Sequence, residues 1–154
     1  MQRLRSNPRP FLLAAAAVTL IIAFFVVVAP LFTTGGAPSA EIAGAFPDTA
    51  TVGAPLELDV GLDNVGTAVI SPVCVRVTIT GPVDEDRAVF QGEDTVAFRR
   101  GLACGGSLDG MDTISVKVFL RPRATGSARV SIEPAQGSAP VGTALVGSVR
   151  LVSG

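Results

Sequence analysis

The amino-acid sequence predicts an all-β fold, a single antiparallel β-sandwich preceded by one N-terminal transmembrane helix. Three observations lead to this prediction. Residues 11–32 form an unbroken run without charge. Beyond residue 40, apolar and polar residues alternate in short stretches separated by Gly and Pro, which is the pattern of half-buried strands. No stretch of that part repeats with the 3.6-residue period of an amphipathic helix.

Residues 1–10 are predicted to be a basic, cytoplasmic N-terminus. They carry Arg3, Arg5 and Arg9, and the next positive residue along the chain is Arg76. Because the cytoplasmic side of membrane proteins is enriched in Lys and Arg, this asymmetry predicts that everything after Phe32 lies outside. We therefore expect a single-pass protein of the cell membrane with an extracytoplasmic C-terminal domain.

The apolar run 11–32 is long enough to cross a bilayer. Its 22 residues, at about 1.5 Å each, would span about 33 Å as a helix, close to a hydrocarbon thickness of about 30 Å. A secretory signal has a shorter apolar core of about 7–15 residues, so the length favours an uncleaved signal-anchor. The alternative is a cleaved signal, because Ala43-Gly44-Ala45 is a small-residue pattern that signal peptidases accept.

Residues 33–40 are small, polar and rich in Gly and Pro, which predicts a flexible linker to a domain that covers 41–154. Strong alternation predicts strands around 56–62, 73–79, 114–120, 128–132 and 145–151. Weaker strands are expected near 41–46, 87–91 and 94–99. Seven or eight short strands with one apolar face each predict a sandwich of immunoglobulin type, although the Trp of antibody domains is missing.

The stretch VGAPLELDVGLDNVGTAV, residues 52–69, resembles the start of the bacterial cell-adhesion-related (CARDB) Ig-like domains. In that family a Gly-x-Pro entry leads into an alternating strand, an Asn-x-Gly-Thr turn and a second long strand. Here the turn is Asn-Val-Gly-Thr at 64–67, and the resemblance covers residues 52–80. It implies an extracytoplasmic sandwich that serves as a spacer or adhesion module, and it carries over no catalytic residue.

Cys74 and Cys104 are the only cysteines, and both fall on the side predicted to be exported. An even count in an oxidising compartment favours a disulfide. Cys74 falls on the polar side of its strand, and Cys104 lies in the Gly-rich stretch 101–106, which is interpreted as a loop. We therefore expect a peripheral link between a loop and a strand, not the inter-sheet bridge of antibody domains. A redox or metal role is the weaker alternative, because the chain has no His.

The composition argues against an enzyme. Without His there is no Ser-His or Cys-His pair, and no Gly-rich phosphate loop carries its Lys. The acidic stretches 84–86 (Asp-Glu-Asp) and 109–112 (Asp-Gly-Met-Asp) are the candidates for carboxylate chemistry or calcium binding. Neither has the spacing of a calcium loop, and both are interpreted as solvated turns. No catalytic, cofactor-binding or metal-binding residue is predicted.

Four arginines, Arg99, Arg100, Arg121 and Arg123, are candidates for a basic interaction patch that faces anionic headgroups or an anionic envelope polymer. The alternative is that they solvate strand ends. The chain beyond residue 10 carries a formal charge of −4, so it lacks the basic surface of a nucleic-acid binder.

The sequence as a whole predicts a non-enzymatic, membrane-anchored Ig-like protein. It would act as an accessory or interaction subunit, or as an assembly factor, of a membrane or cell-envelope complex. Its expected partners are the membrane and an integral membrane protein or envelope component, with no small-molecule substrate. The alternative is a secreted or tethered module that binds a lipid or an ion. The abundance of Ala, Gly, Val and Arg suggests a bacterial protein.

Overall fold

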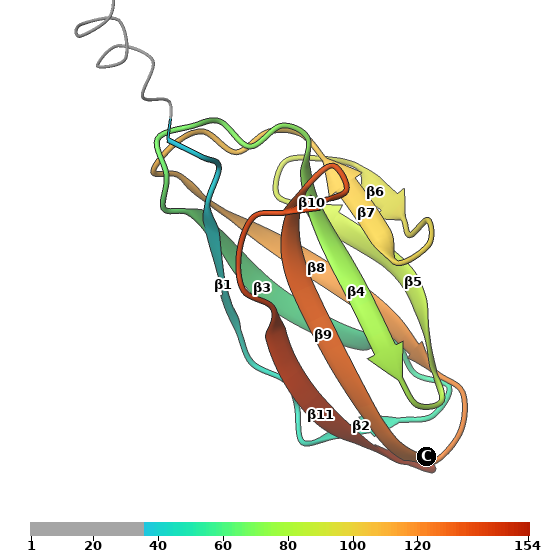
Figure 1. Ribbon diagram of the computed structural model, residues 1–154. Coiled ribbons are helices and arrows are strands. Elements are labelled where there is room, and N and C mark those ends of the chain that lie inside the picture. The colour runs from blue at the N-terminus through green and yellow to red at the C-terminus, as the bar shows by residue number, and fades with distance from the viewer. Residues whose placement is uncertain (1–35) are drawn as a thin grey trace, which may run out of the picture. The chain divides into compact units, whose positions relative to one another are not determined.

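Alternating apolar and polar residues fold residues 36–154 into two stacked β-sheets (Figure 1). These are the residues that the computed structural model describes. The predicted cytoplasmic N-terminus, the predicted transmembrane helix and residues 33–35 of the predicted linker lie outside them. Within 36–154 there is no helix of the length and hydropathy needed to cross a membrane.

The first sheet has the strand order β1-β3-β8-β5-β6, and each neighbouring pair is antiparallel. Its strands are β1 (Ala40–Gly44), β3 (Leu56–Asn64), β5 (Val83–Phe90), β6 (Thr95–Ala97) and β8 (Thr113–Pro122). In β3 the apolar positions are buried and the acidic positions between them are exposed. Each strand therefore turns one face to the second sheet and the other to solvent.

The second sheet has the order β2-β11-β9-β4-β7, and the short β10 also pairs with β9. Its strands are β2 (Thr49–Thr51), β4 (Val73–Thr80), β7 (Leu102–Gly105), β9 (Gly126–Gln136), β10 (Ala139–Pro140) and β11 (Leu145–Val152). All pairs are antiparallel except β2 with β11, which run parallel.

The strand order confirms the immunoglobulin-like sandwich. Leaving aside the short strands β2, β6, β7 and β10, seven remain. The first sheet then holds the first, second, fifth and fourth of them, and the second sheet holds the seventh, sixth and third. These are the ABED and GFC sheets of the immunoglobulin fold.

Apolar side chains from both sheets fill the interior. The largest fully buried ones include Leu58, Leu120 and Phe90 from the first sheet and Val75 and Ile132 from the second. This arrangement gives one continuous core, as expected for a sandwich.

The two sheets approach each other closely where Phe90 of the first sheet meets Gly105 of the second. A Cβ atom on Gly105 would lie 2.8 Å from the Phe90 ring, so the ring occupies the space that a side chain would need. Glycine is therefore required on β7 at this point for a steric reason.

The Gly-rich stretch 101–106, expected to be a loop, contains strand β7, so that expectation was wrong. A two-residue turn at Arg100 and Gly101, both with positive φ, carries the chain from β6 in the first sheet to β7 in the second. The glycines permit this tight turn, and the buried Ala103 then pairs with Val75 of β4.

The acidic stretch 84–86 lies within β5, so its interpretation as a solvated turn was also wrong. The register shifts by one residue between Glu85 and Arg87, which marks a β-bulge. Each acid is satisfied there: Asp84 pairs with Arg123, Asp86 with Arg121, and Glu85 accepts a hydrogen bond from the Gly101 amide of the β6–β7 turn. Three consecutive acids hide the alternation that would have revealed the strand.

The described chain begins at one end of the sandwich, and the C-terminus lies at the other (Figure 1). Three segments lie together at the end where it begins: residues 36–39, residues 65–72 between β3 and β4, and residues 106–112 between β7 and β8. A Cβ on Gly66 would lie 3.3 Å from the carbonyl oxygen of Ala37 and 3.5 Å from the amide of Ser39, so the entering chain lies against 65–72. We call these three segments the loop end.

Candidate interaction surfaces

One buried polar residue organises the loop end. Within residues 36–154, Asn64 is the polar residue that is fully buried. Its side-chain nitrogen lies within hydrogen-bonding distance of three backbone carbonyls, at 2.8 Å from Ala68, 3.2 Å from Leu108 and 3.0 Å from Asp109. Its side-chain oxygen accepts a hydrogen bond from the amide of Gly66. The same amide group therefore fixes both loops. It provides hydrogen-bond partners for backbone groups that a neighbouring strand would pair in a sheet.

Backbone hydrogen bonds join the two loops directly. Ile70 and Leu108, both buried, exchange a pair of hydrogen bonds of 2.9 and 3.0 Å. Gly110 lies so close to Thr67 that a Cβ atom would be 2.5 Å from the Thr67 carbonyl oxygen. The loop end is therefore a fixed surface, not a pair of free loops.

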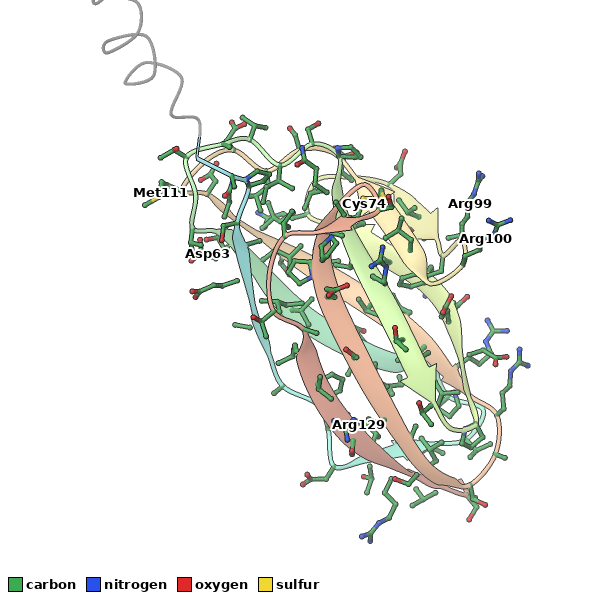
Figure 2. The ribbon with its side chains drawn as sticks, in the orientation of Figure 1. Asp63, Cys74, Arg99, Arg100, Met111 and Arg129 are labelled. Carbon is green, nitrogen blue, oxygen red and sulfur yellow. A yellow bond between two sulfur atoms is a disulfide. The ribbon has the colours of Figure 1, made fainter. Side chains whose placement is uncertain are left out.

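Apolar side chains project from this fixed surface into solvent. Val65, Val69 and Met111 are 42%, 49% and 72% exposed. The other exposed large apolar residues of the described chain, Val146 and Val152, lie on β11. Figure 2 shows Met111 pointing away from the sandwich close to the point where the described chain begins.

The predicted disulfide is present and joins two neighbouring strands of the second sheet. Cys74 on β4 and Cys104 on β7 lie directly opposite each other, with a Cα–Cα distance of 4.0 Å. The expectation that it is not an inter-sheet bridge is confirmed, whereas its description as a link between loop and strand was wrong. Cys74 faces outward, as its alternation predicted, yet it is fully buried.

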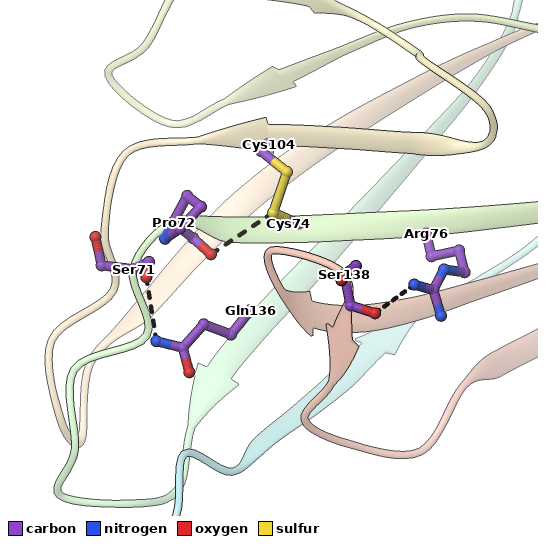
Figure 3. The surroundings of a disulfide bond; sticks show 7 residues. All are labelled: Ser71, Pro72, Cys74, Arg76, Cys104, Gln136 and Ser138. Atoms are coloured by element: carbon purple, nitrogen blue, oxygen red, sulfur yellow. Dashed lines mark hydrogen bonds between the residues drawn. A yellow bond between two sulfur atoms is a disulfide. The ribbon is translucent and has the colours of Figure 1, made fainter.

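Polar contacts surround the disulfide (Figure 3). The guanidinium of Arg76 donates a hydrogen bond of 2.6 Å to the carbonyl of Ser138, and the side-chain amide of Gln136 donates one of 3.1 Å to the carbonyl of Ser71. The Cys74 sulfur lies 3.6 Å from the Pro72 carbonyl oxygen. This last pair is a contact without a hydrogen bond, because a disulfide sulfur carries no proton.

The four predicted patch arginines fall into two pairs with different surroundings. Arg121 lies 3.5 Å from Asp86, and Arg123 forms an ion pair with Asp84. For Arg99 and Arg100 the described residues provide no ion pair, and both side chains extend from the β6–β7 turn (Figure 2). Half of the predicted patch is therefore neutralised by neighbouring carboxylates.

Charged and hydroxyl groups on the outer face of the first sheet pair across strands. Lys117 donates a hydrogen bond of 2.7 Å to Glu57, and Ser115 donates one of 2.7 Å to Asp59. The hydrogen bond to Glu57, followed by the charge of that carboxylate, raises the pKa of Lys117 above 10.5. Next to this row, the Arg87 guanidinium lies 4.3 Å from the centre of the Phe119 ring.

The outer face of the second sheet carries two arginines that sequence reasoning missed. Arg129 and Arg150 lie on β9 and β11 and take part in no ion pair within residues 36–154. Where β9 pairs with β11, Arg129 lies opposite Ser148 and Arg150 lies opposite Ser127. The alternation of apolar and polar residues predicted both strands. It could not predict that residues with hydroxyl groups lie opposite these arginines on the neighbouring strand.

Hollows on the described surface are open to solvent and have volumes of about 240 to 460 Å³. One is lined by residues around Arg150, and another lies between β6 and β7 beside Cys104. In residues 36–154 there is no group of three or more Cys, Asp or Glu side chains arranged to hold a metal ion.

The fold resembles solved structures. The CARDB domain of PF1109 from Pyrococcus furiosus superposes with a TM-score of 0.53 and 18% identity, over 75% of this chain and 95% of that one. Its structure in complex with di-metal ions gives 0.52 and 19%, over 76% and 94%. The domain has a CARDB-like fold. No family model and no curated protein matches the sequence itself.

A second similarity shows how little this fold says about activity. AvmM, which catalyses macrocyclization in alchivemycin A biosynthesis, superposes with a TM-score of 0.53 and 18% identity, over 76% of this chain and 89% of AvmM. The structures that this domain resembles therefore include a catalyst as well as the CARDB domain of PF1109. The function must be argued from the residues of this chain.

Proposed function

We propose that the protein is a non-enzymatic, single-pass membrane protein. It displays its CARDB-like domain outside the membrane and acts as an interaction subunit or assembly factor of a membrane complex. The observation that carries the proposal is the short distance along the chain between the apolar run, which ends at Phe32, and the first described residue of the folded domain, Gly36.

This spacing limits how far the domain can move from an anchor. Four residue steps reach at most about 14 Å, so Gly36, where the folded domain begins, stays within that distance of the last apolar residue. A partner embedded in the same membrane is within reach of such a domain, whereas a distant wall polymer is not. The short tether therefore supports a partner in the membrane complex.

The disulfide supports the orientation. Disulfides persist in oxidising compartments and are rare in the cytosol, and Cys74–Cys104 lies in the part of the chain that the upstream arginines predict to be outside. The surface supports binding of a protein partner at the outside of the domain. The interior is filled by apolar side chains, the hollows are open, and arginines without an ion pair among residues 36–154 lie on the β6–β7 turn and on the second sheet.

The test uses the full chain with a C-terminal tag. Membranes are washed with alkaline carbonate, treated with protease from outside, and then solubilised in a mild detergent for tag purification. We expect a carbonate-resistant protein whose domain is accessible from outside, whose cysteines react only after reduction, and which co-purifies with a membrane protein in stoichiometric amount.

A matched variant has a cleavable signal in place of residues 1–32, so that the same domain is released. It should lose the partner if tethering to the membrane matters. A full-length protein that purifies as a monomer with bound lipid and no protein partner would contradict the proposal and support a ligand-binding module instead.

A further inference from the structure

The three apolar side chains of the loop end are exposed although the surface around them is rigid. Val65, Val69 and Met111 project from loops fixed by Asn64. A flexible loop could fold such side chains against the sandwich, but here the backbone hydrogen bonds hold them outward. Exposed apolar side chains grouped at one site mark an interaction surface more often than scattered ones do.

Met111 carries the strongest indication of function. Its φ of 64° lies in the left-handed region, which residues other than Gly adopt at a cost. Its amide donates hydrogen bonds of 3.0 Å to the carbonyls of both Asn64 and Gly66, and these bonds hold that conformation. The fold therefore keeps its most exposed large apolar side chain at a residue with an unfavourable backbone conformation. Such strain is typical of functional sites, and the function here would be contact with a second surface.

The link between the apolar run and the sandwich determines which part of the domain lies near the anchor. Gly36 lies against the 65–72 loop, so the loop end is the part of the sandwich joined to the apolar run. If that run crosses the bilayer, as the proposed function requires, Gly36 at the loop end lies within about 14 Å of the last apolar residue. The bilayer surface is then in reach of these three side chains with or without a partner.

We propose that the loop end rests on the lipid surface, with Val65, Val69 and Met111 inserted among the headgroups. Side chains at the tips of fixed loops can bury apolar area in this way while the sandwich stays in water. Such a contact would fix the orientation of the sandwich. It would also direct the outer faces of the two sheets sideways, toward neighbouring membrane proteins.

Charge specifies the kind of lipid. The three segments of the loop end contain no Lys or Arg, but they contain Asp109 and Asp112, and Asp63 lies just before them at the end of β3. All three carboxylates belong to exposed residues. Anionic headgroups would repel them, so the loop end fits a zwitterionic surface better than an anionic one.

The absence of Trp and Tyr from the sequence makes a direct test possible. Met111→Trp introduces a single tryptophan into the full chain, which is placed in nanodiscs of phosphatidylcholine with or without brominated acyl chains. We expect its emission to shift to shorter wavelength and to be strongly quenched by the brominated lipid. Val69→Trp gives a second probe of the same surface if the first variant folds poorly.

Val152→Trp is the matched control, because Val152 is an exposed valine of the opposite end. Its emission should resemble that of tryptophan in water and should not be quenched. Discs made of phosphatidylglycerol should weaken the quenching at position 111. Asp109→Asn together with Asp112→Asn should restore it.

The outcomes separate this inference from the proposed function. A chain that stays in the disc but shows unquenched tryptophan at positions 69 and 111 would overturn the lipid contact alone, and would point to a protein partner for the loop end. A chain that does not stay in the disc would overturn the anchor and the lipid contact together.

Discussion

Asn64 shows how a single residue can determine the shape of one end of a sandwich. It ends β3, and its buried amide group bonds to backbone atoms of two loops, one of them more than forty residues further along the chain. Sequence reasoning recognised the Asn-Val-Gly-Thr segment as a turn. It could not identify two partners of the amide, Leu108 and Asp109, because they come from the connection between β7 and β8.

We predict that Asn64→Ala destabilises the domain by about 3 kcal/mol, because a buried amide that satisfies several backbone groups is removed. Chemical denaturation followed by circular dichroism measures the loss. Asp63→Ala, at the exposed neighbouring position, should change the free energy of unfolding by less than about 0.5 kcal/mol. Equal effects of the two substitutions would rule out the organising role of Asn64.

Lys117 is the only lysine of the chain, so its titration can be followed without ambiguity. Glu57 raises its pKa above 10.5, so the interaction is complete at neutral pH and is lost as the pH rises through the raised pKa. Glu57→Gln should bring the pKa back toward 10.5, measured by NMR of the side-chain carbon next to the amine. Asp59→Asn should lower it less, because Asp59 contributes the smaller charge effect.

At the scale of elements, β7 depends on its neighbours more than the long strands do. It has four residues, lies at the edge of the second sheet and is joined to β4 by the disulfide. Its Gly105 also makes room for Phe90 of the other sheet. These two contacts explain why a Gly-rich stretch without alternation is a strand.

Removing the disulfide with Cys74→Ala and Cys104→Ala should lower the free energy of unfolding by about 3.5 kcal/mol in the chain-entropy model. The loss should appear first as faster hydrogen exchange of β7 amides, because the bond holds that edge strand. Reduction of the wild-type protein is the matched comparison and should give the same order of effect. Because the global free energy of unfolding falls, amides of both sheets should also exchange faster, and an increase at β7 no larger than in the other strands would contradict a local role.

Gly105→Ala should destabilise the domain by about 1–3 kcal/mol, because the new methyl group would overlap the Phe90 ring. Gly61→Ala on β3 is a suitable control, since its Cβ would meet no atom closer than 4.0 Å. Thermal unfolding of both variants distinguishes overpacking from a general effect of replacing a strand glycine.

At the scale of the whole molecule, one core joins the two sheets, and the two ends of the sandwich differ. The loop end carries exposed apolar side chains and carboxylates, whereas paired acids and arginines occupy the far end of β5 and β8. Because both sheets share the core, neither sheet should remain folded when the other unfolds.

Leu58→Ala, in the centre of the first sheet, should therefore lower the stability of both sheets together. We expect a loss of about 3 kcal/mol from the cavity and a single transition. Hydrogen exchange measured on β3 and on β9 should report the same global free energy. Two separate transitions would show that the sheets are independent, and Val152→Ala serves as an exposed control.

The sequence by itself determined the all-β class, the immunoglobulin-like sandwich and the cysteine pair, because alternation and Gly or Pro punctuation are local signals. The tertiary structure decided the rest. Strand β7, the acidic strand β5 and the buried Asn64 depend on partners that are distant in the chain. The grouping of Val65, Val69 and Met111 likewise exists only because strand order brings two separate loops to the end where the folded chain begins.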